Sequence, residues 1–206
     1  MKFIDLTKSS KTSFHLKSGE RVVFFMKNRS GTFDFVLAGT GAEAHIFALF
    51  DEKKSSAFSL EIRQHHTAPN TESTALVKSL LAGNSSLSYQ GLIRIEKGST
   101  TSDAKQENRN LLLSEEASAV SIPSLEILES DVVCEHASTT GTLSEEAILY
   151  MKTRGLDQAQ AETLLAEGFV NSFYDEIARY GKFFEGKTQN PETQKSKQST
   201  KHRNQT

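Results

Sequence analysis

Residues 76–113 read LVKSLLAGNSSLSYQGLIRIEKGSTTSDAKQENRNLLL. Short apolar runs at 76–81, 87–95 and 111–113 alternate here with turn signals at Gly83-Asn84 and Lys97-Gly98. Small hydroxyl and amide side chains lie beside the runs, and no Asn-Gly hairpin turn joins two of them. In a β-solenoid such side chains can stack as polar ladders between neighbouring coils. This stretch therefore favours stacked strands over hairpins.

The same pattern extends in both directions from this stretch. Further strand candidates are Arg21–Met26, Thr32–Leu37, Ala44–Phe50, Ala57–Ile62, Ser121–Leu128 and Val132–Cys134. Regularly spaced short strands suit a sandwich, a barrel or a solenoid. Only 36% of the residues are hydrophobic and Trp is absent, which suits the narrow core of a solenoid. We expect a mainly β core over residues 1–141, with a parallel β-helix over about residues 20–140.

The pattern becomes helical after residue 141. Ser144 precedes two acids and Asp157 precedes an Ala/Leu-rich run, so both are expected to be helix N-caps. Gly155 and Gly168 are expected to end helices. The sequence thus predicts three short helices within 142–184, and the third has an apolar face made by Phe169, Phe173, Ile177 and Tyr180.

Composition narrows the class of protein. The single cysteine, Cys134, excludes an intramolecular disulfide and indicates a reducing compartment. No apolar run reaches the roughly 18 residues of a membrane span, and Asp5 interrupts any apolar signal-peptide stretch. The net charge of −2 indicates neither a nucleic-acid nor a membrane partner. We expect a cytoplasmic protein whose polar, basic tail, residues 185–206, is disordered.

Cys134 and His136 are the candidate functional pair. Residues i and i+2 of a strand share one face, about 6.6 Å apart, which suits two ligands of one metal or an interface. Glu135 would point to the opposite face unless a bulge turns it. The alternative is a small buried cysteine beside a surface histidine. His65 and His66 form a second histidine cluster. Adjacent residues of a strand point to opposite faces, so these two side chains cannot hold one metal ion, and we expect them at the exposed end of a strand.

Several runs carry a family resemblance. Residues 106–114, QENRNLLLS, resemble the core of the SufB/SufD scaffolds of the SUF iron–sulfur assembly system. So do residues 123–127, 131–137, 141–146, 153–155 and 164–169, in the same order. The resemblance implies a right-handed parallel β-helix followed by a short C-terminal helical module. It also implies side-by-side pairing through the β-helix and docking of an ABC-type ATPase on the helices.

The chain is most similar to the SufD type, which carries a cysteine and a histidine two residues apart, as at Cys134 and His136. Together with Glu135 these become expected ligands for iron or a transient iron–sulfur cluster shared with a partner chain. The adjacent pair Glu135-His136, in contrast, is typical of the SufB type. The SufB type also carries a cysteine at the position where this chain has Ala117. Full-size members also carry a helical N-terminal domain, and we expect this chain to be a member without it. The expected ATPase-docking residues are Tyr150, Leu164, Phe169, Phe173 and Ile177.

The resulting hypothesis is a non-enzymatic scaffold subunit that forms a homodimer, or a heterodimer with a SufB-type subunit. The alternative is a β-helix enzyme that acts on a polysaccharide or an acyl acceptor. Such an enzyme needs converging acids, Arg or His on one face, or a strict hexapeptide period in an acyltransferase. The sequence shows neither pattern.

Overall fold

The computed structural model describes residues 1–52 and 55–184, so the predicted disordered tail lies outside the described residues. These residues form eleven strands and two helices. The strands are β1 Lys2–Asp5, β2 Ser13–Leu16, β3 Arg21–Lys27, β4 Gly31–Leu37, β5 Glu43–Glu52, β6 Ala57–His66, β7 Glu72–Leu81, β8 Ser86–Ile95, β9 Ser102–Leu112, β10 Ser118–Ile127 and β11 Val132–Thr142. The helices are α1 Glu145–Thr153 and α2 Gln158–Ala178.

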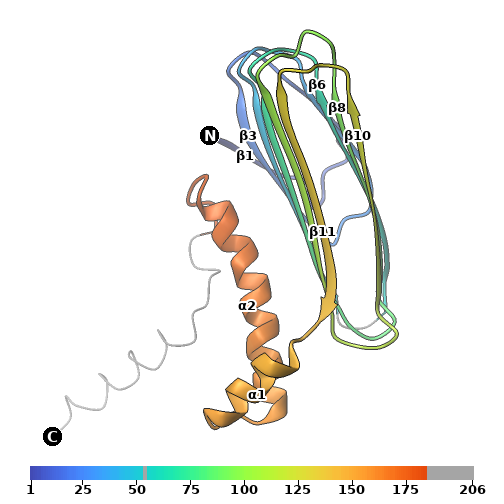
Figure 1. Ribbon diagram of the computed structural model, residues 1–206, viewed down its shortest axis with the longest axis vertical. Helices are drawn as coiled ribbons and strands as arrows, with labels where there is room; N and C mark the ends of the chain where they lie inside the picture. Colours follow the sequence, from blue (N-terminus) through green and yellow to red (C-terminus); the bar gives the residue numbers. More distant parts are fainter. Residues whose placement is uncertain (53–54, 185–206) are drawn as a thin grey trace, which may run out of the picture.

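The strands form a parallel β-helix (Figure 1). Odd-numbered strands build a six-stranded sheet in the order β1-β3-β5-β7-β9-β11, and even-numbered strands build a five-stranded sheet in the order β10-β8-β6-β4-β2. Every pairing is parallel, and each strand contacts the strand two places away in the chain. The predicted β-helix with a C-terminal helical module is confirmed. It begins earlier than residue 20, however, because β1 and β2 already belong to the two sheets.

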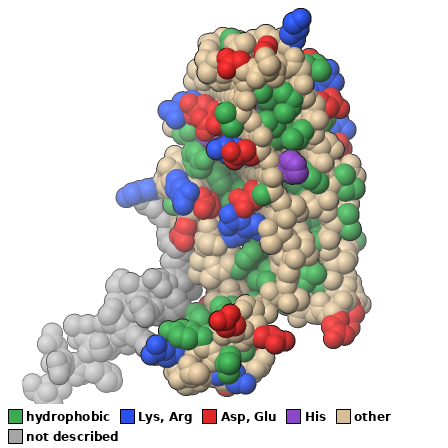
Figure 2. Space-filling view, viewed as in Figure 1, with side chains coloured by type: hydrophobic (Ala, Val, Ile, Leu, Met, Phe, Trp, Pro, Cys, Tyr) green, Lys and Arg blue, Asp and Glu red, His purple; other side chains and the backbone are tan. Residues whose placement is uncertain are grey.

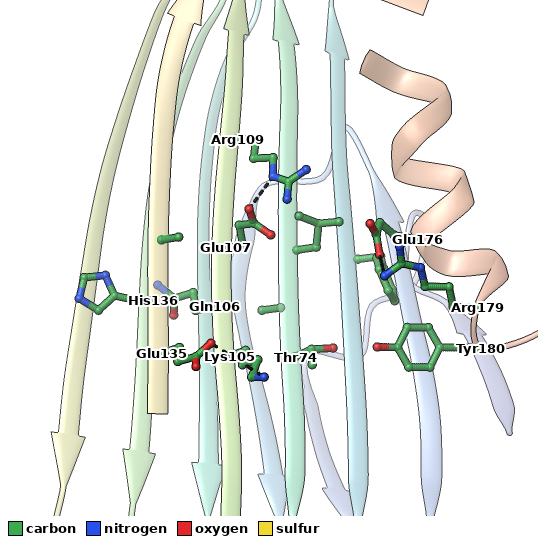
Figure 3. A pocket seen from close by; sticks show the side chains of 14 residues that line it. Thr74, Lys105, Gln106, Glu107, Arg109, Glu135, His136, Glu176, Arg179 and Tyr180 are labelled. Atoms are coloured by element: carbon green, nitrogen blue, oxygen red, sulfur yellow. Dashed lines mark hydrogen bonds and ion pairs between the residues drawn. The ribbon is translucent and has the colours of Figure 1, made fainter. Parts of the chain in front are cut away.

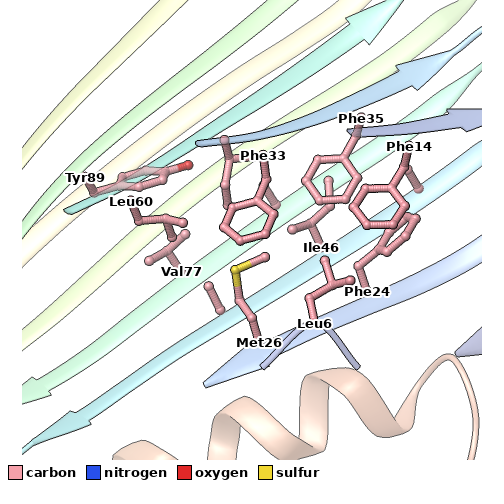
Figure 4. Packing of buried hydrophobic residues seen from close by; sticks show 14 of the residues in the cluster. Leu6, Phe14, Phe24, Met26, Phe33, Phe35, Ile46, Leu60, Val77 and Tyr89 are labelled. Carbon is pink, nitrogen blue, oxygen red and sulfur yellow. The ribbon is translucent and has the colours of Figure 1, made fainter. Parts of the chain in front are cut away.

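The interior of the early coils is aromatic and aliphatic. Alternate residues of each strand point inward, and Phe14, Phe24 and Phe35 pack together there with ring centroids 4.7–5.4 Å apart. Figure 4 shows these rings beside Met26 and Ile46 between the two sheets. Burial of such side chains contributes about 1.5–3 kcal/mol each, so this cluster is the main source of stability for the first coils.

The interior of the later coils is partly polar. Asn108 and Asn110 on β9 are buried and donate hydrogen bonds to each other's carbonyl oxygens. Ser79 of the preceding coil donates to Asn110, and Asn110 donates to Thr140 of the following coil. The expected polar ladder is therefore present. Mutual hydrogen bonding removes most of the desolvation cost of these side chains.

The prediction for β9 was too short. We expected a strand only at residues 111–113, whereas β9 begins at Ser102. Its inward residues before Leu111 are Ser102, Ala104, Gln106, Asn108 and Asn110, all buried. Only one of them is apolar, so the alternation that normally reveals a strand is absent from the sequence.

The helical module has two helices rather than three. Ser144 and Asp157 are the N-caps as predicted, and Asp157 forms a reciprocal capping box with Gln160. The prediction that Gly168 ends a helix is wrong, because α2 continues through it to Ala178. A glycine inside a helix costs about 1 kcal/mol, which is less than the gain from burying Phe173 on the next turns.

Helix α2 covers the outer face of the six-stranded sheet. Phe173 and Ile177 are fully buried there against Phe25, Phe47 and Leu76. Phe3, Tyr180, Phe183 and Phe184 extend this second core around the end of the helix. The apolar face predicted for this helix therefore packs against the chain's own β-helix.

Lys78 of β7 is buried beneath the same helix. Its Nζ donates to the Phe169 carbonyl oxygen at 2.9 Å and to Ser172 Oγ at 2.6 Å, and lies 4.4 Å from the centre of the Phe169 ring. Burial is the main cause that lowers the pKa of Lys78 to about 8. An ammonium group thus joins the β-helix to α2 at a desolvated site.

Candidate functional site

Strand β11 presents Cys134 and His136 on one face, as its alternation predicts. Cys134 pairs in register with Ala104 and His136 with Gln106, two buried inward-facing residues of β9. Both side chains therefore face the interior side of the solenoid. In the sheet orders of the described residues, β10 and β11 are end strands, so this last coil has no further coil above it. The predicted pair lies at the open mouth of the β-helix.

Cys134 is half-buried on this face. Its side chain packs against the cluster of Ile93, Ile95 and Ala104, and its thiol is free. Burial raises the pKa of the Cys134 thiol, and the negative charges of Asp103 and Glu135 raise it further. The thiol is therefore protonated and weakly nucleophilic on its own. A bound metal ion would supply the positive charge that favours the thiolate.

His136 is exposed and lies beside Gln106. The Gln106 side chain is only 3% exposed, and its Oε1 has no hydrogen-bond partner in the described part of the chain. Gly91 on β8 makes room for this amide, because a Cβ there would lie 2.1 Å from Gln106 Nε2. A glycine–glutamine contact thus spans the coil directly beneath His136.

Glu135 points the other way, to the outer face of the six-stranded sheet. Its carboxylate lies 3.9 Å from Lys105 Nζ, at one side of a groove of about 610 Å³ between this sheet and α2. Figure 3 shows Tyr180 and Arg179 across the groove and His136 directed away from Glu135. The structure therefore places Cys134 and His136 together and separates Glu135 from them.

The donor set is small. Within residues 1–52 and 55–184, no group of three or more His, Cys, Asp or Glu side chains is placed to hold a metal ion. Cys134 and His136 offer two donors of the kinds that ligate iron in clusters, which are commonly held by four protein ligands. This chain could therefore supply half of a ligand set.

The expected docking residues fall into two groups. Tyr150 and Leu164 are 56% and 39% exposed, and sequence reasoning missed Leu149, which is 63% exposed. Phe173 and Ile177 are buried against the sheet, and Phe169 is half-buried over Lys78. The exposed apolar surface of the helical module therefore lies on α1 and the first half of α2.

His66 corrects the expectation of a surface histidine pair. His65 and His66 do face opposite sides of β6, but His66 is fully buried. Its ring nitrogens contact Thr71 Oγ1 and Ser73 Oγ, each at 2.7 Å. Burial is the main cause that lowers the pKa of His66 to about 4, so the ring is neutral at pH 7. It is part of the polar interior.

Comparison with known proteins identifies the chain. The family model for the SufBD core domain of SUF-system FeS cluster assembly matches residues 20–169. The chain belongs to the SufBD family. An iron–sulfur cluster assembly SufBD family protein of Mycobacterium tuberculosis is 31% identical over 148 residues, which cover 68% of this chain and 37% of that protein. An iron–sulfur cluster assembly SufBD family protein of Staphylococcus epidermidis is 26% identical over 142 residues, which cover 69% of this chain and 30% of that protein.

The chain spans about a third of the length of these curated relatives. The runs that resemble the SufB/SufD core lie together in the structure. Residues 106–114 include the second half of β9, 123–127 lie on β10, and 132–137 of the next run lie on β11. The described helices include none long and apolar enough to cross a membrane. Three of the resembling runs thus lie on the last strands of the β-helix, and the other three lie in or next to the helical module.

Proposed function

We propose that this chain is a scaffold subunit, closer to the SufD type, of a SUF-type iron–sulfur cluster assembly complex. One observation carries the proposal: Cys134 and His136 project from the same face of the last, uncovered coil. A cluster is the cargo of this subunit, because the two donors complete a ligand set only with a second molecule. The subunit positions the cargo and carries out no turnover of its own.

The partner chain pairs with the last coil. β10 and β11 have 10 and 11 residues, and each leaves one row of backbone N–H and C=O groups free at a sheet edge. Val120, Ile122 and Val133 on these strands are about half exposed. A second β-helix that continues both sheets would cover these groups and place its own ligands opposite Cys134 and His136.

An ATPase docks on the helical module. Leu149 and Tyr150 on α1 and Leu164 on α2 are the large apolar side chains that the module exposes within the described residues. Grouped apolar surface of this kind marks interaction sites. The connection from β11 to α1 is short, from Thr142 to Glu145, so movement of a bound ATPase would reach the open coil directly.

The cluster role is tested with Cys134→Ser and His136→Ala in the complex reconstituted with a SufB-type subunit and the ATPase. We expect iron and sulfide retained per complex to fall at least several-fold while the complex still assembles. Ser138→Ala is the matched control, because Ser138 lies on the same exposed face two residues further along β11. Unchanged iron and sulfide in both variants would show that these residues are not ligands.

The docking role is tested with Leu149→Asp and Tyr150→Asp. We expect each to reduce ATPase binding in a pull-down at least ten-fold, because an aspartate would have to be buried at an apolar interface. Glu146→Gln is the control, since Glu146 is exposed on the same helix. Retained binding by both aspartate variants would place the ATPase elsewhere.

A further inference from the structure

Helix α2 covers a single charged side chain. Among the described residues, Lys78 is the one Lys, Arg, Asp or Glu that is buried. Its Nζ donates to the Phe169 carbonyl oxygen and to Ser172 Oγ, and Ser172 Oγ donates to the same carbonyl oxygen at 2.8 Å. Both acceptors are neutral and both belong to α2. A buried ammonium group is strongly destabilising unless it keeps such partners, so its position constrains the helix.

The other contacts between α2 and the sheet are apolar or aromatic. Phe173 and Ile177 pack against Phe25 and Phe47 as α2 runs along the six-stranded sheet (Figure 1). Within the described residues, the two hydrogen bonds of Lys78 are those that join α2 to a strand. Apolar contact is non-directional. It holds the helix against the sheet and discriminates poorly between positions along the helix axis.

The apolar face of α2 repeats itself along this axis. A large apolar side chain recurs at every fourth residue, in the series Leu165, Phe169, Phe173 and Ile177. Four residues correspond to about 6 Å of helix. After a shift of this length Phe169 could replace Phe173, and Phe173 could replace Ile177, so the sheet would stay covered. A shift in the other direction would put Gly181 in the place of Ile177, which the loss of apolar contact already disfavours.

Lys78 distinguishes the observed position from the shifted one. In the shifted position the Leu165 carbonyl oxygen would replace that of Phe169, so the backbone acceptor would be kept. Gly168 would replace Ser172, however, and glycine has no hydroxyl group. The ammonium group would lose one of its two acceptors at a site that water does not reach. Hydrogen bonds to charged groups are the stronger ones, so this loss disfavours the shifted position.

We infer that Lys78 is a positioning residue, which selects one position of α2 along the sheet and thereby fixes where the ATPase-docking surface lies relative to the open coil. This inference rests on the docking surface of the proposed function and assigns the residue that places it. Figure 2 shows exposed apolar side chains on the helical module, at the lower end of the view. Only residues 154–157 join α1 to α2, so a shift of α2 by about 6 Å would displace α1 with it.

The test measures the position of α2 in the isolated chain as a distance between two spin labels. The labels are attached at Glu146→Cys on α1 and Lys97→Cys in the turn before β9, two exposed positions, and Cys134→Ser removes the native thiol. Pulsed electron paramagnetic resonance should show one distance in this chain. Lys78→Met should add a second population, displaced by up to about 6 Å. Lys105→Met, at a half-exposed lysine of the adjacent strand, is the matched control and should not add one.

A second variant keeps Lys78 and moves its acceptor. Gly168→Ser with Ser172→Ala supplies the hydroxyl group four residues earlier in α2. A Cβ at residue 168 would meet no atom within 4 Å, so a serine fits there. The displaced population should exceed the original one in this double variant. Ser172→Ala alone offers no hydroxyl group in either position, so its displaced population should be smaller.

The inference is overturned if Lys78→Met keeps the single original distance, because Lys78 would then add stability without selecting a position. It is also overturned if the double variant shows no displaced population, and this variant decides the question if Lys78→Met does not fold. The distances are measured without the ATPase and without iron. Retained ATPase binding by Leu149→Asp would therefore refute the docking surface and leave the result for α2 unchanged.

Discussion

Replacing Lys78 with Met should change how the stability of the protein depends on pH. Lys78 is 1% exposed, and its ammonium group is held by Phe169 and Ser172 of α2. Methionine keeps most of the apolar stem and removes the charge. At pH 7 the lost hydrogen bonds lower the free energy of unfolding, and removal of a buried charge raises it. We therefore expect a net change in the free energy of unfolding within about 2 kcal/mol.

The magnitude follows from the pKa of Lys78, which falls from 10.5 to about 8 in the folded chain. Between these two values the unfolded chain still binds the proton that the folded chain has lost. The free energy of unfolding therefore rises with pH in this window, by about 1.4 kcal/mol per pH unit and about 3 kcal/mol in total. Below pH 8 this contribution is constant.

The assay is urea unfolding followed by the helical circular dichroism signal, at several pH values between 7 and 10.5. The wild type minus Lys78→Met difference in unfolding free energy should grow by about 3 kcal/mol across this range. Lys105→Met, at a half-exposed lysine of the adjacent strand, is the matched control for removing a lysine from this sheet. Parallel curves for wild type and Lys78→Met would refute a desolvated ammonium group beneath α2.

Three further predictions concern the interior and the open coil. The pKa values of His66 and His45 are both lowered to about 4 by burial, so each should reduce the free energy of unfolding by about 1.4 kcal/mol per pH unit on acidification below pH 6.5. In guanidinium titrations His66→Ala should remove the His66 part of this slope and leave the His45 part. Gly91→Ala should destabilise the chain by about 1–3 kcal/mol in the same assay, and by less when Gln106→Ala is also present. Glu135→Gln should speed iodoacetamide alkylation of Cys134 at pH 8, because the Glu135 charge helps to raise the pKa of the thiol; an unchanged rate would contradict this electrostatic effect.

The features that sequence could predict are those with a local signal. The apolar runs of β3 to β8 and the caps at Ser144 and Asp157 were recognised from neighbouring residues. Strand alternation alone placed Cys134 and His136 on one face and Glu135 on the other. Which face is inward, and that the coil is open there, required the register with β9.

The missed features depend on partners far away in the chain. Asn110 is buried because Ser79, 31 residues earlier, donates to it, and Lys78 is buried because Ser172, 94 residues later, accepts from it. Sequence periodicity treats such polar residues as exposed. Sequence reasoning also ended a helix at Gly168. The contact of Phe173 with Phe25, which stabilises the helix beyond this glycine, cannot be inferred from the residues near Gly168.

The covering of the six-stranded sheet by α2 has a consequence for how the chain is made. During synthesis, Phe25 and Phe47 leave the ribosome about 130–150 residues earlier than Phe173, the side chain that covers them. Successive coils can stack as they emerge, since each contacts only its neighbours. A nascent chain that already contains every strand but not α2 therefore exposes the aromatic outer face of the six-stranded sheet, to which chaperones can bind. That surface is shielded only once α2 has been made and has folded against it.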